Sequence, residues 1–241
     1  MRNSLVKIAV IAALLATPAL AAGTLAEFNA AVERAAAHYR VALGYLRTGN
    51  TDLAALEVER MRETWGQVAR DFAQPPKEMA KDLQLYRNTM LDVGVRLVTA
   101  SMMIDSGRAA VAADALRAIR NELSDLRKAN GIVVLADCVR DANAAMDALY
   151  VFNDRDLDWS RPGVAKDLQA RAASYGSTLK RCDGLADART RADPEFRRLV
   201  DGAAASLTFI PKAIETRDAG LLHRVMIELR AFDHLLAFRY G

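Results

Sequence analysis

Residues 28–72 read FNAAVERAAAHYRVALGYLRTGNTDLAALEVERMRETWGQVARDF, with a polar turn at Thr48-Gly49-Asn50. In the first arm, apolar residues recur at three- and four-residue steps, the spacing of one face of an amphipathic helix. Gly49 suits a left-handed helix C-cap, and Asn50 can cap the helix that follows. The stretch therefore predicts two antiparallel helices, the second of which buries Leu53, Leu56, Val58, Met61, Trp65, Val68 and Phe72.

A related pattern occurs twice more along the chain. Residues 97–126 turn at Ser106-Gly107-Arg108, and residues 209–240 turn at Thr216-Arg217-Asp218. We interpret these stretches as further helical hairpins of the same kind. Two readings stay open here: the hairpins derive from an internal duplication, or they share only the pattern that any two antiparallel helices show.

The composition predicts an all-α protein. The chain has 241 residues, is 52% apolar and 6% aromatic, and is rich in alanine and leucine, which favours helices. The pattern predicts about eight helices, including one over 77–105 and one from Pro194 to about Thr216. Because the connections are short, we expect antiparallel hairpins that form two four-helix bundles, residues 23–130 and 131–241. One larger helical array is the alternative.

Residues 1–22 have the features of a secretory signal peptide. Arg2 and Lys7 precede a short apolar run, and Ala19-Leu20-Ala21 fits a cleavage site. The apolar run is too short to span a bilayer comfortably. We therefore expect a periplasmic protein with no membrane span after cleavage.

The charge of the chain argues against nucleic acid as a partner. Without Arg2 and Lys7, the formal net charge of +3 falls to about +1, and no basic run is present. A protein or small-molecule partner of unknown identity is the remaining expectation.

The two cysteines are predicted to form a disulfide. The midpoint between Cys138 and Cys182 is Ser160, which lies in a predicted loop between two helices. Residues equally far from the turn of an antiparallel hairpin lie side by side, and an oxidising periplasm permits the bond. A redox or metal pair is the weaker alternative, because no C-x-x-C motif or neighbouring histidine accompanies these residues.

Met146, His223 and Met226 form a candidate metal set. His223 and Met226 are three residues apart on one predicted helix, and Met146 falls near their level if its helix runs antiparallel. Methionine and histidine facing each other inside a bundle can ligate haem b or copper. The alternative is that both methionines fill the core and that His223 lies at its boundary. No cofactor is the leading expectation.

The signal segment, the alanine-rich helices and the L-x-T-G-N-x-x-x-A-A turn at Leu46 to Ala55 resemble the cytochrome c′ family of periplasmic four-helix bundles. The resemblance implies that fold. It carries no haem residue to this chain, because the sequence has no C-x-x-C-H motif. The Thr48-Gly49 hairpin also resembles tetratricopeptide repeats, without their short fixed period.

No motif for nucleophilic catalysis is present, and an enzyme is not the favoured interpretation. We expect a secreted helical-bundle protein with a non-catalytic binding or scaffolding role. The alternatives are a non-covalent haem b or copper binder in the C-terminal bundle and a helical-repeat adaptor that binds a peptide.

Overall fold

The computed structural model describes residues 23–241, and the predicted signal segment 1–22 lies outside them. The regular structure of the described residues is helical and includes no strand, so the all-α prediction is confirmed. The helices are α1 (Leu25–Thr48), α2 (Thr51–Asp71), the 3-10 turn η1 (Lys77–Met79), α3 (Leu83–Asp105), α4 (Ala109–Ala129), α5 (Leu135–Tyr150), α6 (Val164–Leu185), α7 (Ala188–Ala192), α8 (Pro194–Leu207), α9 (Ile210–Thr216) and α10 (Ala219–Tyr240). None of these helices is long and apolar enough to cross a membrane.

The N-terminal group comprises α1–α4, which pack around one apolar core. A capping box of Thr24 and Glu27 starts α1, and Gly49 ends it in a left-handed conformation with φ of 80°. Phe28 and Phe72 meet edge to face at 5.2 Å, and the Tyr86 hydroxyl donates to the Phe72 carbonyl. These contacts close the end of the group opposite the Gly49 turn.

The C-terminal group comprises α5–α10 and has a core of its own. Helix α10 packs against α5 and α8, and α6 packs against α5 and α8. The two short helices, α7 and α9, lie at the ends of α8. Whether each group folds independently, with a boundary at residue 130, stays a prediction.

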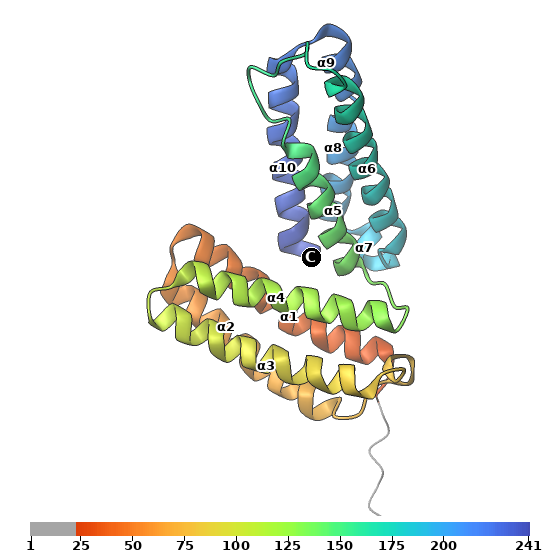
Figure 1. Cartoon of the computed structure of the whole chain (residues 1–241). Coiled ribbons are helices and arrows are strands. Elements are labelled where there is room, and N and C mark those ends of the chain that lie inside the picture. The colour runs from red at the N-terminus through yellow and green to blue at the C-terminus, as the bar shows by residue number, and fades with distance from the viewer. Residues whose placement is uncertain (1–22) are drawn as a thin grey trace, which may run out of the picture.

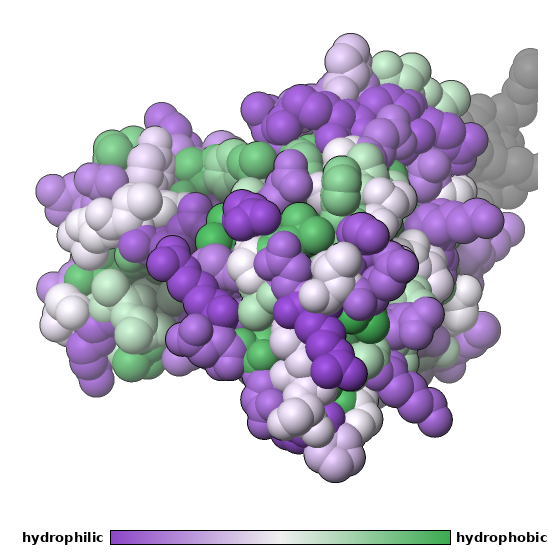
Figure 2. Space-filling view, turned by 90° about the horizontal axis from the view of Figure 1, so that it is seen from above, coloured by the Kyte–Doolittle hydropathy of each residue, from purple (hydrophilic) through white to green (hydrophobic). Residues whose placement is uncertain are grey.

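The two groups meet near the lower end of α10, which abuts α1 (Figure 1). Arg40 on α1 donates to the Gly241 carbonyl oxygen at 3.0 Å. The far end of the C-terminal group carries mostly hydrophilic side chains, with apolar residues scattered among them (Figure 2).

Three local expectations were wrong. Leu53 and Leu56 are 45% and 47% exposed, so α2 buries a narrower stripe than predicted. The third long helix begins at Leu83 rather than Lys77, because the Asp82 carboxylate caps it by accepting from the Leu85 N–H. The helix expected from Pro194 to Thr216 is divided into α8 and α9, since Pro211 lacks the N–H that a continuous helix needs.

The structure brings Cys138 on α5 and Cys182 on α6 to disulfide distance, as their spacing predicted. Their Cα atoms are 5.3 Å apart, and both side chains are fully buried. The bond closes a loop with a sequence separation of 44 residues. It fixes α5 against α6 across the connection 151–163.

Replacing both cysteines with serine is expected to lower the free energy of unfolding by about 3–4 kcal/mol, the chain-entropy value for a loop of this length. Urea denaturation, monitored by circular dichroism, measures this change in the free energy of unfolding. A reductant should destabilise the natural chain and leave the double variant unchanged. Equal midpoints for the oxidised chain and the variant would contradict the prediction.

Arg127 on α4 and Asp137 on α5 form a buried ion pair, in which Arg127 Nη2 lies 2.6 Å from Asp137 Oδ1. The stability of the fold is expected to be sensitive to the loss of either partner. Asp137→Ala leaves a buried guanidinium without its carboxylate and should cost about 3–5 kcal/mol of stability. Asp114→Ala is the matched control, because Asp114 pairs with Arg117 on an exposed surface and should cost less than about 1 kcal/mol. A similar decrease in the free energy of unfolding for the two variants, measured by urea denaturation, would contradict this prediction.

Candidate functional site

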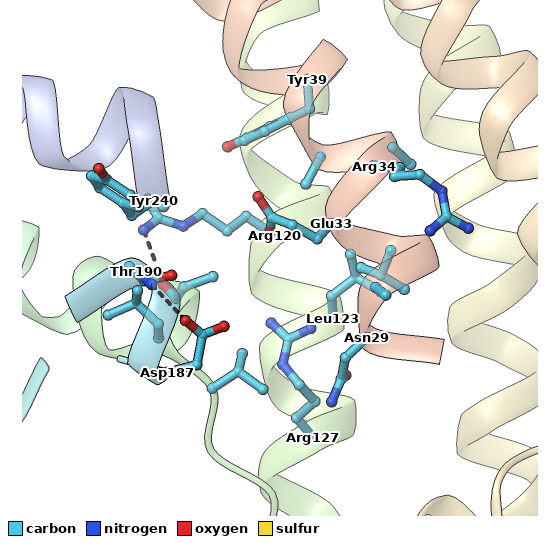
Figure 3. Close-up of a pocket in the computed structure, with 18 of the residues that line it drawn as sticks. Asn29, Glu33, Arg34, Tyr39, Arg120, Leu123, Arg127, Asp187, Thr190 and Tyr240 are labelled. Carbon is cyan, nitrogen blue, oxygen red and sulfur yellow. Dashed lines mark hydrogen bonds between the residues drawn. The ribbon is translucent and has the colours of Figure 1, made fainter. Parts of the chain in front are cut away.

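A cleft of about 740 Å³ lies where the two groups meet. One wall comes from α1, α2 and α4, and the other from residues 133–136 at the start of α5, the segment 185–190 and the end of α10 (Figure 3). The apolar side chains that line it are Ala26, Ala30, Val32, Ala35, Ala36, Met61, Trp65, Ile119, Leu123, Val133, Val134, Leu135, Ala136 and Leu185. Apolar side chains therefore predominate in the cleft, and the charged residues of its lining are four arginines and two acids.

Two arginines of the cleft come from one face of α4. Arg120, Leu123 and Arg127 follow at three- and four-residue steps, so they lie on the same side of the helix. This side faces α5 and the cleft rather than open solvent. The sequence of α4 thus places two cations beside an apolar surface.

The charge of Arg127 is already neutralised. Arg127 Nε and Nη2 donate to the two carboxylate oxygens of Asp137 at 2.8 and 2.6 Å, and both residues are buried. Burial acts to raise the pKa of Asp137, but the hydrogen bonds and charge of Arg127 outweigh it and hold the pKa below its ordinary value. This pair ties α4 to α5.

Arg120 has no acidic partner among the described residues. Its Nη1 donates to Asn143 Oδ1 at 3.1 Å and its Nη2 to the Ala136 carbonyl at 3.2 Å. Its Nε is buried and makes no hydrogen bond within residues 23–241. Burial lowers the pKa of Arg120, although an arginine stays protonated. Arg120 therefore brings to the cleft a positive charge that no carboxylate of residues 23–241 contacts directly.

The acids that line the cleft are engaged elsewhere. Glu33 accepts from Arg40 Nη2 at 2.6 Å, and Asp187 caps α7 by accepting from the Thr190 N–H at 2.6 Å. Arg34 and Arg189 are exposed at the cleft and make no ion pair within the described part of the chain. In Figure 3 the Tyr39 hydroxyl points into the same space. The cleft thus presents an excess of positive charge over a largely apolar lining.

A buried polar network leads from Arg120 into the C-terminal group. Asn143 Nδ2 donates to Asp233 Oδ1 at 2.9 Å, and Arg230 Nη1 lies 3.5 Å from Asp233 Oδ2. Asp233 is only 1% exposed, and burial raises its pKa to about 6. The Tyr175 hydroxyl is buried and has no hydrogen-bond partner within residues 23–241. Burial raises the pKa of Tyr175, and the charge of Asp233 adds to this effect.

A second hollow of about 480 Å³ lies among α1, α4 and α10 and shares Tyr39 and Arg120 with the cleft. Its lining residues include Arg40, Arg47, Arg117, Arg120 and His234, and no carboxylate from residues 23–241 is among them. Burial, assisted by the charges of Arg230 and Arg47, lowers the pKa of His234. Both the cleft and the second hollow are therefore electropositive.

The three residues of the predicted metal set differ in burial. Met146 and Met226 are fully buried in the C-terminal core, whereas His223 is only partly buried. His223 Nε2 accepts from Arg155 Nε at 3.0 Å, and its Nδ1 is buried with no hydrogen-bond partner in the described part of the chain. Within residues 23–241, no three His, Cys, Asp or Glu side chains are grouped to hold a metal ion. A haem or copper site that uses the methionines stays a prediction.

Sequence reasoning missed Arg120, Arg127, Asp137 and Asp233. A signal was available, because Arg120, Arg127 and Asp233 occupy positions in the apolar repeat of their helices. A charged residue on an apolar helix face marks a buried ion pair or a site. The cleft itself has no such signal, since residues far apart in the sequence form it.

Comparison of the chain with protein-family models, with curated proteins and with solved structures finds no match. The resemblance to cytochrome c′ stays a prediction. The site is therefore interpreted from its own geometry.

The contribution of Asp233 to stability is expected to fall between about pH 4 and pH 6, because folding raises the pKa of this carboxyl from 3.8 to about 6. The folded state binds the proton of Asp233 more tightly than the unfolded state does. The stabilisation that results is fully present below the unfolded pKa and is lost as the pH rises through about 6. The free energy of unfolding should decrease by about 2–3 kcal/mol from this group alone.

Urea denaturation at a series of pH values tests this. Asp233→Asn keeps a side-chain oxygen that can accept from Asn143 and should remove this part of the pH dependence. The control is Asp114→Asn, which alters an exposed carboxylate that pairs with Arg117. Asp114 is not among the charges that act on Asp233, so this variant should preserve the pH dependence. The same pH slope in the natural chain and Asp233→Asn would show that Asp233 is not responsible.

Proposed function

We propose that this protein is a non-catalytic binding protein whose site is the cleft between the two helical groups. Its ligand is a small amphipathic molecule with an apolar body and one negatively charged group. The observation that carries the proposal is Arg120, a largely buried cation with no acidic partner among residues 23–241 and an unpaired Nε.

The energetics of Arg120 support an anionic ligand. A buried charge costs free energy unless an opposite charge or strong hydrogen bonds compensate it. Here the guanidinium has an amide oxygen and a carbonyl oxygen, which are neutral acceptors. A carboxylate or similar anion in the cleft supplies the missing charge, and such charge-assisted hydrogen bonds are stronger than neutral ones.

The shape and lining support an amphipathic body. A volume of about 740 Å³ lies within the range of small-molecule sites, which are mostly apolar with a few placed polar groups. Val133, Leu135 and Leu185 offer apolar surface that is at least partly exposed, and Tyr39 and Asn29 offer polar atoms. An alkyl or aryl portion can lie on this surface while its anionic group faces Arg120.

A binding role fits the chemistry of the cleft better than catalysis. Glu33 and Asp187, the acids of the lining, are held by Arg40 and by the start of α7. Neither is poised as a general base. The proposal includes export to the periplasm, for which the buried cysteine pair is the supporting feature, because disulfides persist in oxidising compartments.

Isothermal titration calorimetry with decanoate tests the proposal, and decanamide is the neutral analogue of the same shape. We expect decanoate to bind about 10- to 100-fold more tightly than decanamide, the range for a hydrogen bond to a charged group. Arg120→Gln should abolish most of the difference. Circular dichroism of this variant shows whether it is folded.

Two surface variants separate a local effect from a general one. Arg189→Glu reverses a charge at the cleft, whereas Arg161→Glu makes the same change on the connection between α5 and α6. Decanoate binding should weaken about 3- to 10-fold with the first and stay unchanged with the second. Equal affinities for decanoate and decanamide, or equal losses in both surface variants, would refute the proposed site.

A further inference from the structure

Helix α3 carries a line of exposed apolar side chains. Leu91, Val95, Val98 and Met102 are 69%, 63%, 45% and 60% exposed. The opposite side of the same helix is buried in the N-terminal core through Val93, Leu97, Ala100 and Ile104. Single exposed apolar residues are ordinary, but a continuous line of large ones on one helix marks an interaction surface.

The spacing within this line is that of a helix–helix seam. The steps from Leu91 to Val95, Val98 and Met102 are four, three and four residues, which is the a/d pattern of a two-stranded coiled coil. Such a seam fits another helix that runs nearly parallel or antiparallel to it. It does not have the width expected of a face buried in a large globular interface.

The backbone of α3 is accessible beside the seam. Gly94 lies between Leu91 and Val98 on the helix surface, and a Cβ atom built on it meets nothing within 4 Å. Ser101, the next residue seven positions on, is also small. A second helix can therefore approach α3 closely along this flank.

The seam is complementary to itself when a copy is reversed. Reversal about the midpoint between Val95 and Val98 sets Leu91 opposite Met102 and Val95 opposite Val98. Arg87 and Asp105 are exposed at opposite ends of α3 and make no ion pair within residues 23–241. In an antiparallel pair, Arg87 of each copy lies within one helical turn of Asp105 of the other copy. A parallel pair would instead bring the two copies of Arg87 together, and likewise the two copies of Asp105.

We propose that α3 is a dimerisation helix, which pairs antiparallel with α3 of a second copy of this chain. The pairing is isologous, because the same residues contribute to both sides of a two-fold axis. In Figure 1, α3 lies on the side of the N-terminal group that faces away from the C-terminal group. A second copy therefore reaches the seam without meeting α5–α10 of the first.

Sedimentation velocity over a range of protein concentrations is the primary test. The natural chain is expected to sediment as a dimer at about 0.1 mM and to dissociate to the monomer on dilution. Val95→Asp places two carboxylates at the centre of the seam and should weaken dimerisation about tenfold or more. The control, Val151→Asp, changes a valine of similar exposure at the end of α5 and should leave the dimer intact.

A charge exchange tests the antiparallel orientation. Arg87→Glu and Asp105→Arg should each weaken the dimer, and the double variant should restore it, because both reversals together recover opposite pairs. None of these exposed positions is part of the core, and circular dichroism confirms folding. Restoration is specific to a second copy in the reversed orientation.

Two results would overturn the proposal. One is a monomer at every concentration tested. The other is a dimer that Val95→Asp leaves unchanged. Co-sedimentation of the monomer with vesicles of phosphatidylglycerol and phosphatidylcholine, lost in Val95→Asp, would assign the seam to a lipid surface instead.

Discussion

The buried ion pair between Arg127 and Asp137 fixes how the two helical groups are joined. Arg127 lies in the last turn of α4 and Asp137 in the first turn of α5. Each charge is on the helix end where the macrodipole favours it, so the pair stabilises both ends as well as the connection between them. Because its two hydrogen bonds are bidentate, it also restricts the orientation of α5 relative to α4.

The cleft follows from joining the groups at a few points. The ion pair holds one side of the junction, and the end of α10 with the contact of Arg40 to Gly241 holds another. Between these points the helices diverge and leave a space lined by apolar side chains from both groups. Arg120 lies in this space without an acid, which is the arrangement expected where a site is maintained at some cost in stability. Its link through Asn143 to Asp233 places a titrating carboxyl of the C-terminal core next to the charge of the cleft.

Periodicity and turn residues were sufficient for the class of fold and for the hairpin at Gly49. The proximity of Cys138 and Cys182 was also predictable, because residues equally far from the turn of an antiparallel hairpin lie side by side. Periodicity does not set the width of a buried stripe, and for this reason Leu53 and Leu56 were wrongly assigned to the core. The cleft was out of reach, because it depends on how α1, α4 and the segment 185–190 come together in space. Arg120 was the nearest available clue, as a cation in an apolar helix position.

The positions of the cleft and of the α3 seam have a consequence for how they can act together. Helices α1 and α4 face the C-terminal group and form the cleft, whereas α3 lies on the opposite side of the N-terminal group (Figure 1). A two-fold axis through α3 therefore leaves both clefts open to solvent and far from the new interface. Self-association and ligand binding then compete for no residue. Any coupling between dimerisation and ligand binding has to pass through the packed core of α1–α4. Such coupling requires that these helices have a second arrangement. On this geometry the dimer brings two independent sites together on one particle, and a ligand with two anionic amphipathic ends gains affinity from it only if it spans both.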